Sequence, residues 1–277
     1  MTDAHHRAAI AERAARAGGI VARESFRGSL AIETKANKND VVTAVDRDAQ
    51  RQVLSTIREE FAGDPFVCEE DVVPPTPDGE DEAVLIDSVP ESGPAWIVDP
   101  IDGTANYVRG NRTWATSVAA VDDGEAVAAA THLPSLGDTY AVGPDGGTRN
   151  GDELAVSDRT DPETFAVVPV GWWDMDERGE FVRLFEALVE RFGDARRIGS
   201  FQTTLAMVAD GSLDATVATM SASAWDTVAG VALIRAAGGT VTDIHGDPWH
   251  HDSEGLVASN GHAHEVAVEA GQAALEE

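Results

Sequence analysis

The chain has 277 residues, 43% of them hydrophobic, and its 20 basic residues are outnumbered by 49 acidic ones, giving a formal net charge of −29. A chain of this length and apolar content can bury a substantial core. Nucleic acids and anionic membranes both require basic surface, so we expect neither as a main partner. We interpret the charge as adaptation to very high salt, where repulsion is screened to within about 3 Å at 1 M.

The cysteine content and the hydropathy of the chain indicate the cellular compartment in which it works. Cys68 is the only cysteine, so no intrachain disulfide can form, as is typical of proteins of the reducing cytoplasm. The first sixteen residues carry no apolar run of the signal-peptide type, and no stretch approaches the ~18 apolar residues of a membrane span. We therefore expect a cytoplasmic protein.

The first hundred residues predict two amphipathic helices and several short strands. Apolar spacing indicates helices over residues 3–26 and from 46 to 61, and short apolar runs indicate strands at 41–45, 66–68 and 84–86. The loop 33–40 contains the only lysines, Lys35 and Lys38, which favours a bound anion over a simply solvated loop. Residues 72–94 are rich in proline, glycine and acid and predict a long surface loop.

The stretch 96–104 reads Trp-Ile-Val-Asp-Pro-Ile-Asp-Gly-Thr and is the centre of the chain's chemistry. Proline cannot donate to a strand ladder, so we expect the strand to end at about Asp99. Two carboxylates held by a stiff turn are ligands of the kind that Mg²⁺ and Ca²⁺ prefer. The alternative is an ordinary turn whose carboxylates cap nearby amides.

The remainder predicts strands first and then alternating strands and helices. Strands are expected at 116–121, 126–131 and 139–142, followed by a glycine-rich break at 144–151. This break divides the predicted domains: an α+β domain over 1–145 with most candidate ligands, and an α/β domain over 146–277 that completes the site. The elements expected in the second are strands at 165–170, 196–198, 214–219, 241–244 and 256–258 and helices at 177–192, 201–209, 227–237 and 262–275.

Several acidic residues fall at strand ends or helix starts. The candidate ligands are Asp46, Glu69, Asp99, Asp102, Asp226 and the Ile101 carbonyl, with Thr104 beside them. Asp46 and Asp226 each have a plain alternative role as helix N-caps. Gly238 and Gly239 predict a helix C-cap. The eight histidines show no zinc spacing, and Trp172 and Trp173 are expected to pack.

Taken together, these motifs resemble the inositol monophosphatase family of lithium-sensitive, Mg²⁺-dependent phosphatases. The resemblance runs from Lys35 to Asn260. It rests on Thr-Ala-Val-Asp at 43–46, paired glutamates at 69–70, the stretch 96–104, Asn-Gly at 150–151 and Trp-Asp-Thr-Val-Ala-Gly at 225–230. It implies an αβαβα sandwich, in the family usually a homodimer, and a small-molecule phosphate monoester as substrate.

The resemblance also implies roles for single residues. Glu69, Asp99 and the Ile101 carbonyl would hold one Mg²⁺, while Asp99, Asp102 and Asp226 would hold a second. Glu69 would contribute to a weaker third ion, and Li⁺ would inhibit. Asp46 and Thr104 would orient and deprotonate the attacking water, with Glu70 nearby. The residues beside the substrate or its phosphate would be Lys35, Gly103, Thr104, Phe201 and Asp226.

Departures from the family pattern leave the substrate open. Cys68 replaces a usual glycine, Phe201 replaces a small residue, and the segment 218–221 lacks a glutamate that often contacts inositol hydroxyls. Inositol-1-phosphate or a related sugar phosphate is expected, with fructose-1,6-bisphosphate as the alternative. A 3′-phosphoadenosine-5′-phosphate phosphatase and a non-enzymatic regulatory protein are less favoured. As a discriminator, Asp102→Asn is expected to abolish turnover with little loss of fold.

Overall fold

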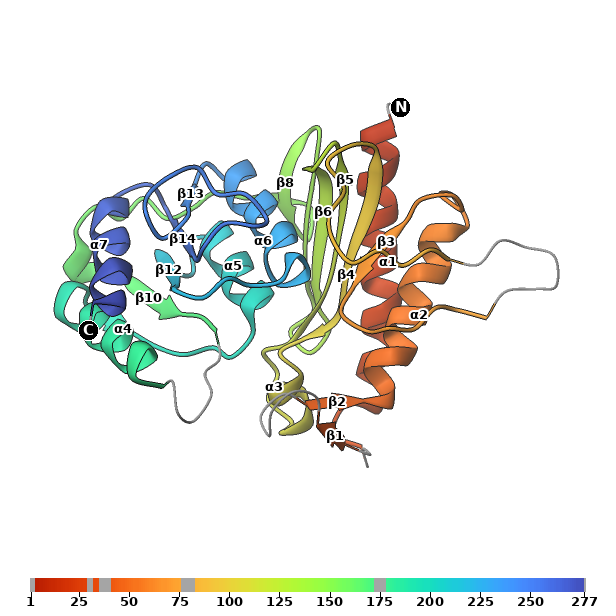
Figure 1. Ribbon diagram of the computed structural model, residues 1–277, viewed down its shortest axis with the longest axis horizontal. Coiled ribbons are helices and arrows are strands. Elements are labelled where there is room, and N and C mark those ends of the chain that lie inside the picture. The colour runs from red at the N-terminus through yellow and green to blue at the C-terminus, as the bar shows by residue number, and fades with distance from the viewer. Residues whose placement is uncertain (1–2, 29–31, 35–40, 76–82, 172–177, 277) are drawn as a thin grey trace.

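The computed structural model describes residues 3–28, 32–34, 41–75, 83–171 and 178–276. Two sheets lie on either side of a central helix pair, and a further helix pair covers the outer face of each sheet (Figure 1). This is the αβαβα sandwich, so the expected fold class is confirmed. The two halves of the chain therefore meet along the central helices.

The first sheet joins seven strands among the described residues, in the order β3-β4-β5-β6-β7-β8-β9. Only β3 and β4 run parallel in it. Helices α1 (Asp3–Ser25) and α2 (Ala44–Arg58) cover its outer face. The strands are β3 (Phe66–Cys68), β4 (Pro94–Asp102), β5 (Ala115–Asp122), β6 (Glu125–Leu133), β7 (Asp138–Gly143), β8 (Gly146–Arg149) and β9 (Asp152–Glu153), and a separate antiparallel pair, β1 (Ile32–Thr34) and β2 (Val41–Thr43), precedes α2.

The second sheet has the order β11-β10-β12-β14-β13 in the described part of the chain. Helices α5 and α6 lie between the sheets, while α4 and α7 cover the far face (Figure 1). The strands are β10 (Ala166–Pro169), β11 (Asp194–Ala195), β12 (Ala215–Ala218), β13 (Thr240–Thr242) and β14 (Leu256–Ser259); the helices are α3 (Thr104–Val108), α4 (Arg178–Arg191), α5 (Phe201–Ala209), α6 (Ala224–Ala236) and α7 (His264–Leu275), with a 3₁₀ turn at Pro162–Thr164.

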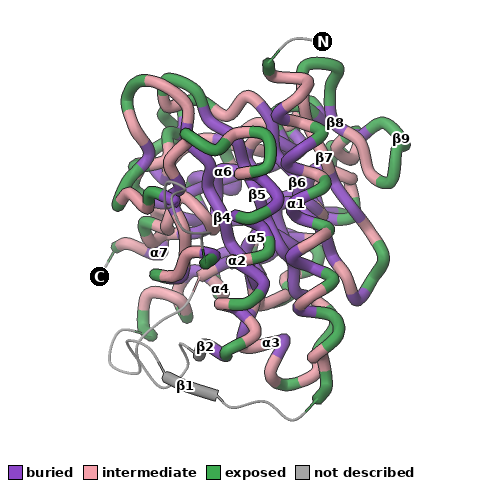
Figure 2. Tube along the Cα trace, turned by 90° about the vertical axis from the view of Figure 1, so that its right-hand side faces the viewer, coloured by how far each residue is buried: buried purple, intermediate pink, exposed green. Residues whose placement is uncertain are grey.

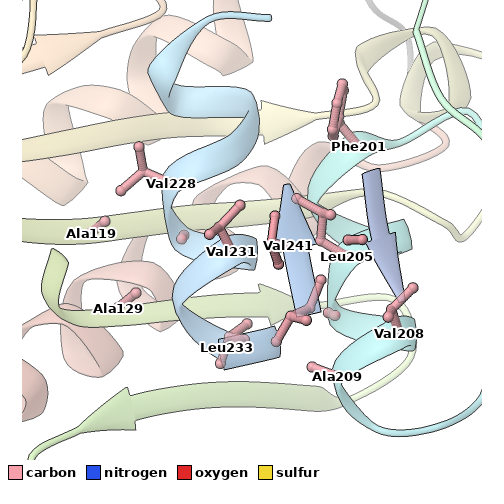
Figure 3. Close-up of a cluster of buried hydrophobic side chains, with 14 of the residues drawn as sticks. Ala119, Ala129, Phe201, Leu205, Val208, Ala209, Val228, Val231, Leu233 and Val241 are labelled. Carbon is pink, nitrogen blue, oxygen red and sulfur yellow. The ribbon is translucent and has the colours of Figure 1, made fainter. Parts of the chain in front are cut away.

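The largest hydrophobic cluster fills the space between the first sheet and the central helices. Val228 and Val231 of α6 lie over the strands that carry Ala119 and Ala129, and Leu205 of α5 packs in the same cluster (Figure 3). Buried residues run through the middle of the molecule along β4 and β5, and exposed residues gather in the connecting loops (Figure 2). This core packs β4, α5 and α6 against one another.

Strand β4 does not end at Asp99 as predicted but continues to Asp102. Asp99 pairs with Ser117 and Asp102 with Ala115, so β4 contains one more residue than β5 over this interval, which is a β-bulge. Such a bulge tolerates proline, because its missing N–H falls where the ladder is already interrupted. The Pro100 carbonyl instead accepts a hydrogen bond from the Thr116 hydroxyl at 2.8 Å.

Three other expected elements differ from the structure. Residues 84–86 form only an isolated bridge from Leu85 to Phe66, and the strand expected at 196–198 is found at β11. The predicted break at 144–151 contains β8, which extends the first sheet. The passage between sheets thus comes after Glu153, while the division into domains at 145/146 remains a prediction.

Helix ends follow local sequence chemistry. The N–H of Gly238 bonds to the Arg235 carbonyl and that of Gly239 to the Ile234 carbonyl, which together form a Schellman motif. Gly238 has φ +85°, the left-handed conformation that favours glycine at this position. The predicted C-cap is confirmed. None of the described helices combines the length and apolar character needed to cross a membrane.

Candidate active site

Three buried or half-buried aspartates converge where the two halves of the chain meet. Asp99 and Asp102 lie on β4, Asp226 lies in the first turn of α6, and one carboxylate oxygen of each falls within 4.8 Å of the others. In a regular strand, residues three apart face opposite sides, so the extra residue of the β4 bulge is what brings Asp99 and Asp102 to one side. The site therefore depends on the irregularity around Pro100.

Asp99 has the more strongly raised pKa of the two aspartates on β4. Burial, followed by the charges of Glu69, Asp102 and Asp226, raises the pKa of Asp99 well above its usual range. Its Oδ1 atom is buried and has no hydrogen-bond partner among the described residues. Carboxylate oxygens gathered without a cation repel one another, and hard divalent cations bind such oxygens. The donor set and the orphaned oxygen both fit Mg²⁺.

Mg²⁺ binding is expected to release protons, because Asp99 in the metal-free protein retains a proton at pH values where an ordinary aspartate does not. A raised folded-state pKa means that metal-free stability falls as pH rises from about 4 through that pKa, and Mg²⁺ should reverse the fall. Calorimetric titration in two buffers of different ionisation enthalpy measures the release. Identical heats in both buffers would contradict the assignment.

Asp102 also serves as the anion at the start of α5. Its carboxylate accepts hydrogen bonds from the backbone N–H groups of Phe201 at 2.8 Å, Gln202 at 3.0 Å and Thr203 at 3.3 Å, and from the Ser200 hydroxyl. Burial raises the pKa of Asp102, while these hydrogen bonds oppose the shift. Ser200 is the N-cap of α5. Asp102 thus ties β4 of the first sheet to a central helix.

A hydroxyl–carboxylate pair lies beside the aspartate cluster. The Thr104 hydroxyl lies 3.2 Å from Asp46 Oδ1 and 2.9 Å from the Ile101 carbonyl oxygen. Thr43, not Asp46, is the N-cap of α2; Asp46 occupies the third position of a capping box, and its Oδ2 accepts from the Thr43 N–H and hydroxyl. One oxygen of Asp46 is therefore anchored to the helix, and the other faces Thr104.

The segment after β3 places the paired glutamates. Glu69 acts electrostatically on Asp99, and Glu70 acts on Asp46, whose pKa is raised by burial and then, among charges, by Glu70. Gln50, one turn after Asp46 on α2, donates to the carbonyls of Glu70 at 2.5 Å and Val72 at 2.8 Å and accepts from the Glu70 N–H at 3.0 Å. Gln50 was not predicted, because an isolated glutamine in a helix carries no sequence signal.

The other predicted site residues take different places. Gly103 has φ +83° and is the N-cap of α3, and a Cβ there would lie 2.9 Å from Ser200 Cβ. The Phe201 ring is 5% exposed and packs in the main cluster, so the residue meets Asp102 through its backbone N–H. Asp226 follows the N-cap Ser223 rather than capping α6 itself. Lys35 lies outside the described residues.

Asn106 is a second residue that sequence reasoning missed. Its amide donates to the Thr113 carbonyl at 2.7 Å and to the Ile198 carbonyl at 2.9 Å, and it also reaches the Gly199 carbonyl at 3.1 Å. These bonds join α3 of the first half to the segment that leads into α5. They support the same junction that Asp102 holds from the other side.

A five-layer α/β fold with carboxylates from both halves gathered at one centre is the arrangement expected of a metal-dependent phosphatase. The model of the inositol monophosphatase family matches residues 3–276, and the chain belongs to this family, whose members are Mg²⁺-dependent phosphoric monoester hydrolases. The predicted family and enzyme class are therefore confirmed.

Individual relatives agree with this assignment. The chain is 32% identical to the fructose-1,6-bisphosphatase/inositol-1-monophosphatase of Thermotoga maritima, over 89% of this chain and 88% of that protein. It is also 32% identical to the inositol-1-monophosphatase of Bacillus subtilis, over 94% of each chain. Among solved structures, an IMPase of Thermotoga maritima superimposes with a TM-score of 0.84 at 26% identity, covering 98% of both chains.

Proposed function

We propose that the chain hydrolyses inositol-1-phosphate or a related sugar phosphate with a water molecule oriented by Thr104 and Asp46. The observation that carries this proposal is the pairing of the Asp99–Asp102–Asp226 cluster with an adjacent hydroxyl–carboxylate pair. A phosphate ester is an anion that resists attack by water. Its hydrolysis therefore requires both charge neutralisation and a positioned base.

The cluster would hold two or three Mg²⁺ ions, with inhibition by Li⁺ expected. The ligands would be Glu69, Asp99, the Ile101 carbonyl, Asp102 and Asp226. Bound Mg²⁺ would supply neutralisation of the phosphate charge and activation of water. The four carboxylates come from the segment after β3, from β4 and from α6, so binding should draw these elements together.

The chain's own groups would then direct the proton. The Thr104 hydroxyl donates to Asp46 and so can accept from the attacking water with its remaining lone pairs, and Asp46 takes the proton that passes along this path. Burial raises the pKa of Asp46, and the negative charge of nearby Glu70 raises it further, which would make Asp46 a better proton acceptor. The N–H groups of Gly103 and Thr104 would donate to the phosphate, and Lys35 would approach it from outside the described residues.

The function is tested by phosphate release in molar KCl, with and without Mg²⁺. The substrates are inositol-1-phosphate, fructose-1,6-bisphosphate and 3′-phosphoadenosine-5′-phosphate. Mg²⁺-dependent turnover of the first supports the proposal. Turnover of only the second or third identifies the alternative substrate, and no turnover by a folded protein with bound Mg²⁺ favours a non-enzymatic regulatory role.

Thr104→Val is expected to lower kcat by about 10²–10³-fold with little change in KM, since valine keeps the shape and removes the hydroxyl that positions water. The matched control is Thr113→Val. This change also removes a threonine hydroxyl, but one that accepts a hydrogen bond from Asn106 instead of facing Asp46. Steady-state kinetics of both variants provides the measurement. Equal losses in the two would refute the assigned role of Thr104.

A fructose-1,6-bisphosphatase activity is the second candidate, and one observation favours it. Arg109 is the C-cap of α3, and Arg197 lies three residues before Ser200, the N-cap of α5. Burial lowers the pKa of the Arg197 guanidinium, and the charge of nearby Arg109 lowers it further. Two neighbouring arginines in so acidic a chain are suited to a second phosphate group.

Arg197→Ala is therefore expected to raise KM for fructose-1,6-bisphosphate by about tenfold or more, and to change KM for inositol-1-phosphate far less. Arg196→Ala is the matched control, because Arg196 pairs with Asp194 on β11 instead. Measuring KM for both substrates in both variants distinguishes the cases. An equal change in KM for the two substrates would contradict the hypothesis that Arg197 binds the second phosphate of a bisphosphate.

The cellular setting completes the proposal. The net charge of −29 supports a protein that works at very high salt, and the single cysteine supports the cytoplasm. We propose a homodimer as the working form, in keeping with the family resemblance. Sedimentation and melting measured from low salt to molar KCl would test both: dimer mass and a melting temperature that rises with salt are expected.

A further inference from the structure

A second group of metal-type ligands lies away from the aspartate cluster. His250, His251 and Asp252 belong to the connection between β13 and β14, and one ligand atom of each falls within 4.8 Å of the others. Asp226 and Arg235 mark the two ends of α6, nine residues apart, or roughly 14 Å along the helix axis. Because Arg235 bonds to the carbonyl of neighbouring Trp249 at 2.7 Å, the second group lies at the end of α6 opposite the aspartates.

The loop that carries this group is held in shape by its own contacts. The His250 N–H bonds to the Ser253 hydroxyl at 2.9 Å, and the Ser253 N–H returns to the His250 carbonyl at 3.0 Å. Trp249 is buried beneath Arg235. His250 Nδ1 lies 2.7 Å from Asp252 Oδ1, and the two imidazole centroids are 4.0 Å apart. The ligand groups are therefore gathered before any ion arrives.

The group stands at the edge of a cleft between the two halves of the molecule. The cleft has a volume of about 280 Å³ and lies between α6, strands β6 and β7, and the 249–251 loop. Glu125, at the start of β6, lines the same cleft and acts electrostatically on His251. The Glu125 carboxylate itself lies 4.0 Å from the Arg235 guanidinium, so it pairs with α6 across the cleft.

We propose that His250, His251 and Asp252 form a binding site for a divalent transition-metal ion at the edge of this cleft. Two imidazoles and a carboxylate are the donors that zinc, cobalt and nickel prefer, whereas the all-oxygen cluster at Asp99 suits magnesium. The two sites would therefore select different metals.

Cobalt provides the test, because its visible spectrum reports the ligands. The full chain, with Mg²⁺ saturating the carboxylate cluster, is titrated with Co²⁺ while visible absorption is recorded. One equivalent with an intense band of the low-coordinate, imidazole-containing kind is expected. The double variant His250→Ala/His251→Ala should bind at least about tenfold more weakly, and Asp252→Asn should weaken binding to a smaller degree.

His245→Ala is the matched control, because His245 is an exposed histidine of the same loop that pairs with Glu254 at 3.2 Å. It should keep wild-type Co²⁺ affinity. Equal affinity in wild type and the double variant, equal loss in the double variant and His245→Ala, or no band at all would each overturn the proposal. Circular dichroism and Mg²⁺-dependent phosphate release, both expected to be unchanged, confirm that the double variant folds.

Discussion

Asp99→Asn is expected to abolish turnover and, at the same time, to raise the melting temperature of the metal-free protein. Loss of the central carboxylate should lower kcat by at least about 10³-fold, equal to roughly 4 kcal/mol of transition-state stabilisation. The stability gain is expected at pH values above the raised pKa of Asp99, where the substitution removes a buried charge that repels Glu69, Asp102 and Asp226 and whose Oδ1 has no partner among the described residues. Activity and metal-free stability should therefore change in opposite directions.

The measurement combines phosphate release with thermal melting, with and without Mg²⁺. Wild type should gain melting temperature on adding Mg²⁺, and Asp99→Asn should gain much less, because ligand binding stabilises only a protein that binds it. Asp87→Asn, at an exposed acid, is the control for the change in net charge. A metal-free Asp99→Asn protein that melts below wild type would show that the carboxylate is not strained.

Asp102→Asn is expected to lose turnover as well, but to destabilise the fold by roughly 2–4 kcal/mol. Its carboxylate accepts from three backbone N–H groups and the Ser200 hydroxyl, and an asparagine would turn an NH₂ group toward some of these donors. In a chain of this size that corresponds to about 3–7 °C in melting temperature. The earlier expectation of little loss of fold therefore does not agree with the contacts at α5.

Ser200→Ala separates the structural part of this effect from the catalytic part. It removes the N-cap hydroxyl and one donor to Asp102 while leaving the carboxylate in place. A loss of about 1 kcal/mol with much of the activity retained is expected. Melting curves of both variants are measured at saturating Mg²⁺. If Asp102→Asn and wild type have the same melting temperature, the carboxylate does not hold α5.

Local pattern was enough for most helices and strands. The helix expected at 201–209 was found at those limits, and the helical spacing after Asp46 was found in α2. Local chemistry also accounts for the end of α6, where the glycine pair satisfies carbonyls that any helix leaves open. These features depend on residues a few positions apart, so periodicity and capping rules reach them.

The failures lie where distant residues compete with local rules. Proline predicted an early end to β4, but pairing with β5 carried the strand on through a bulge. N-capping was the alternative role for Asp46 and Asp226, but Thr43 and Ser223 hold those positions. The expected break at 144–151 became part of the first sheet, because β7 supplied a neighbour for β8.

The sequence by itself determined the family, the layered fold and the set of candidate oxygen ligands, because those depend on residue types in a recognisable order. Only the tertiary structure decided how the ligands meet: the bulge turns Asp99 and Asp102 to one side, and the packing of α6 brings Asp226 from more than a hundred residues away. It also decided that Asp102 is bound to α5 while Asp99 is left with an orphaned oxygen. Such differences arise from burial and from long-range neighbours, which sequence spacing does not encode.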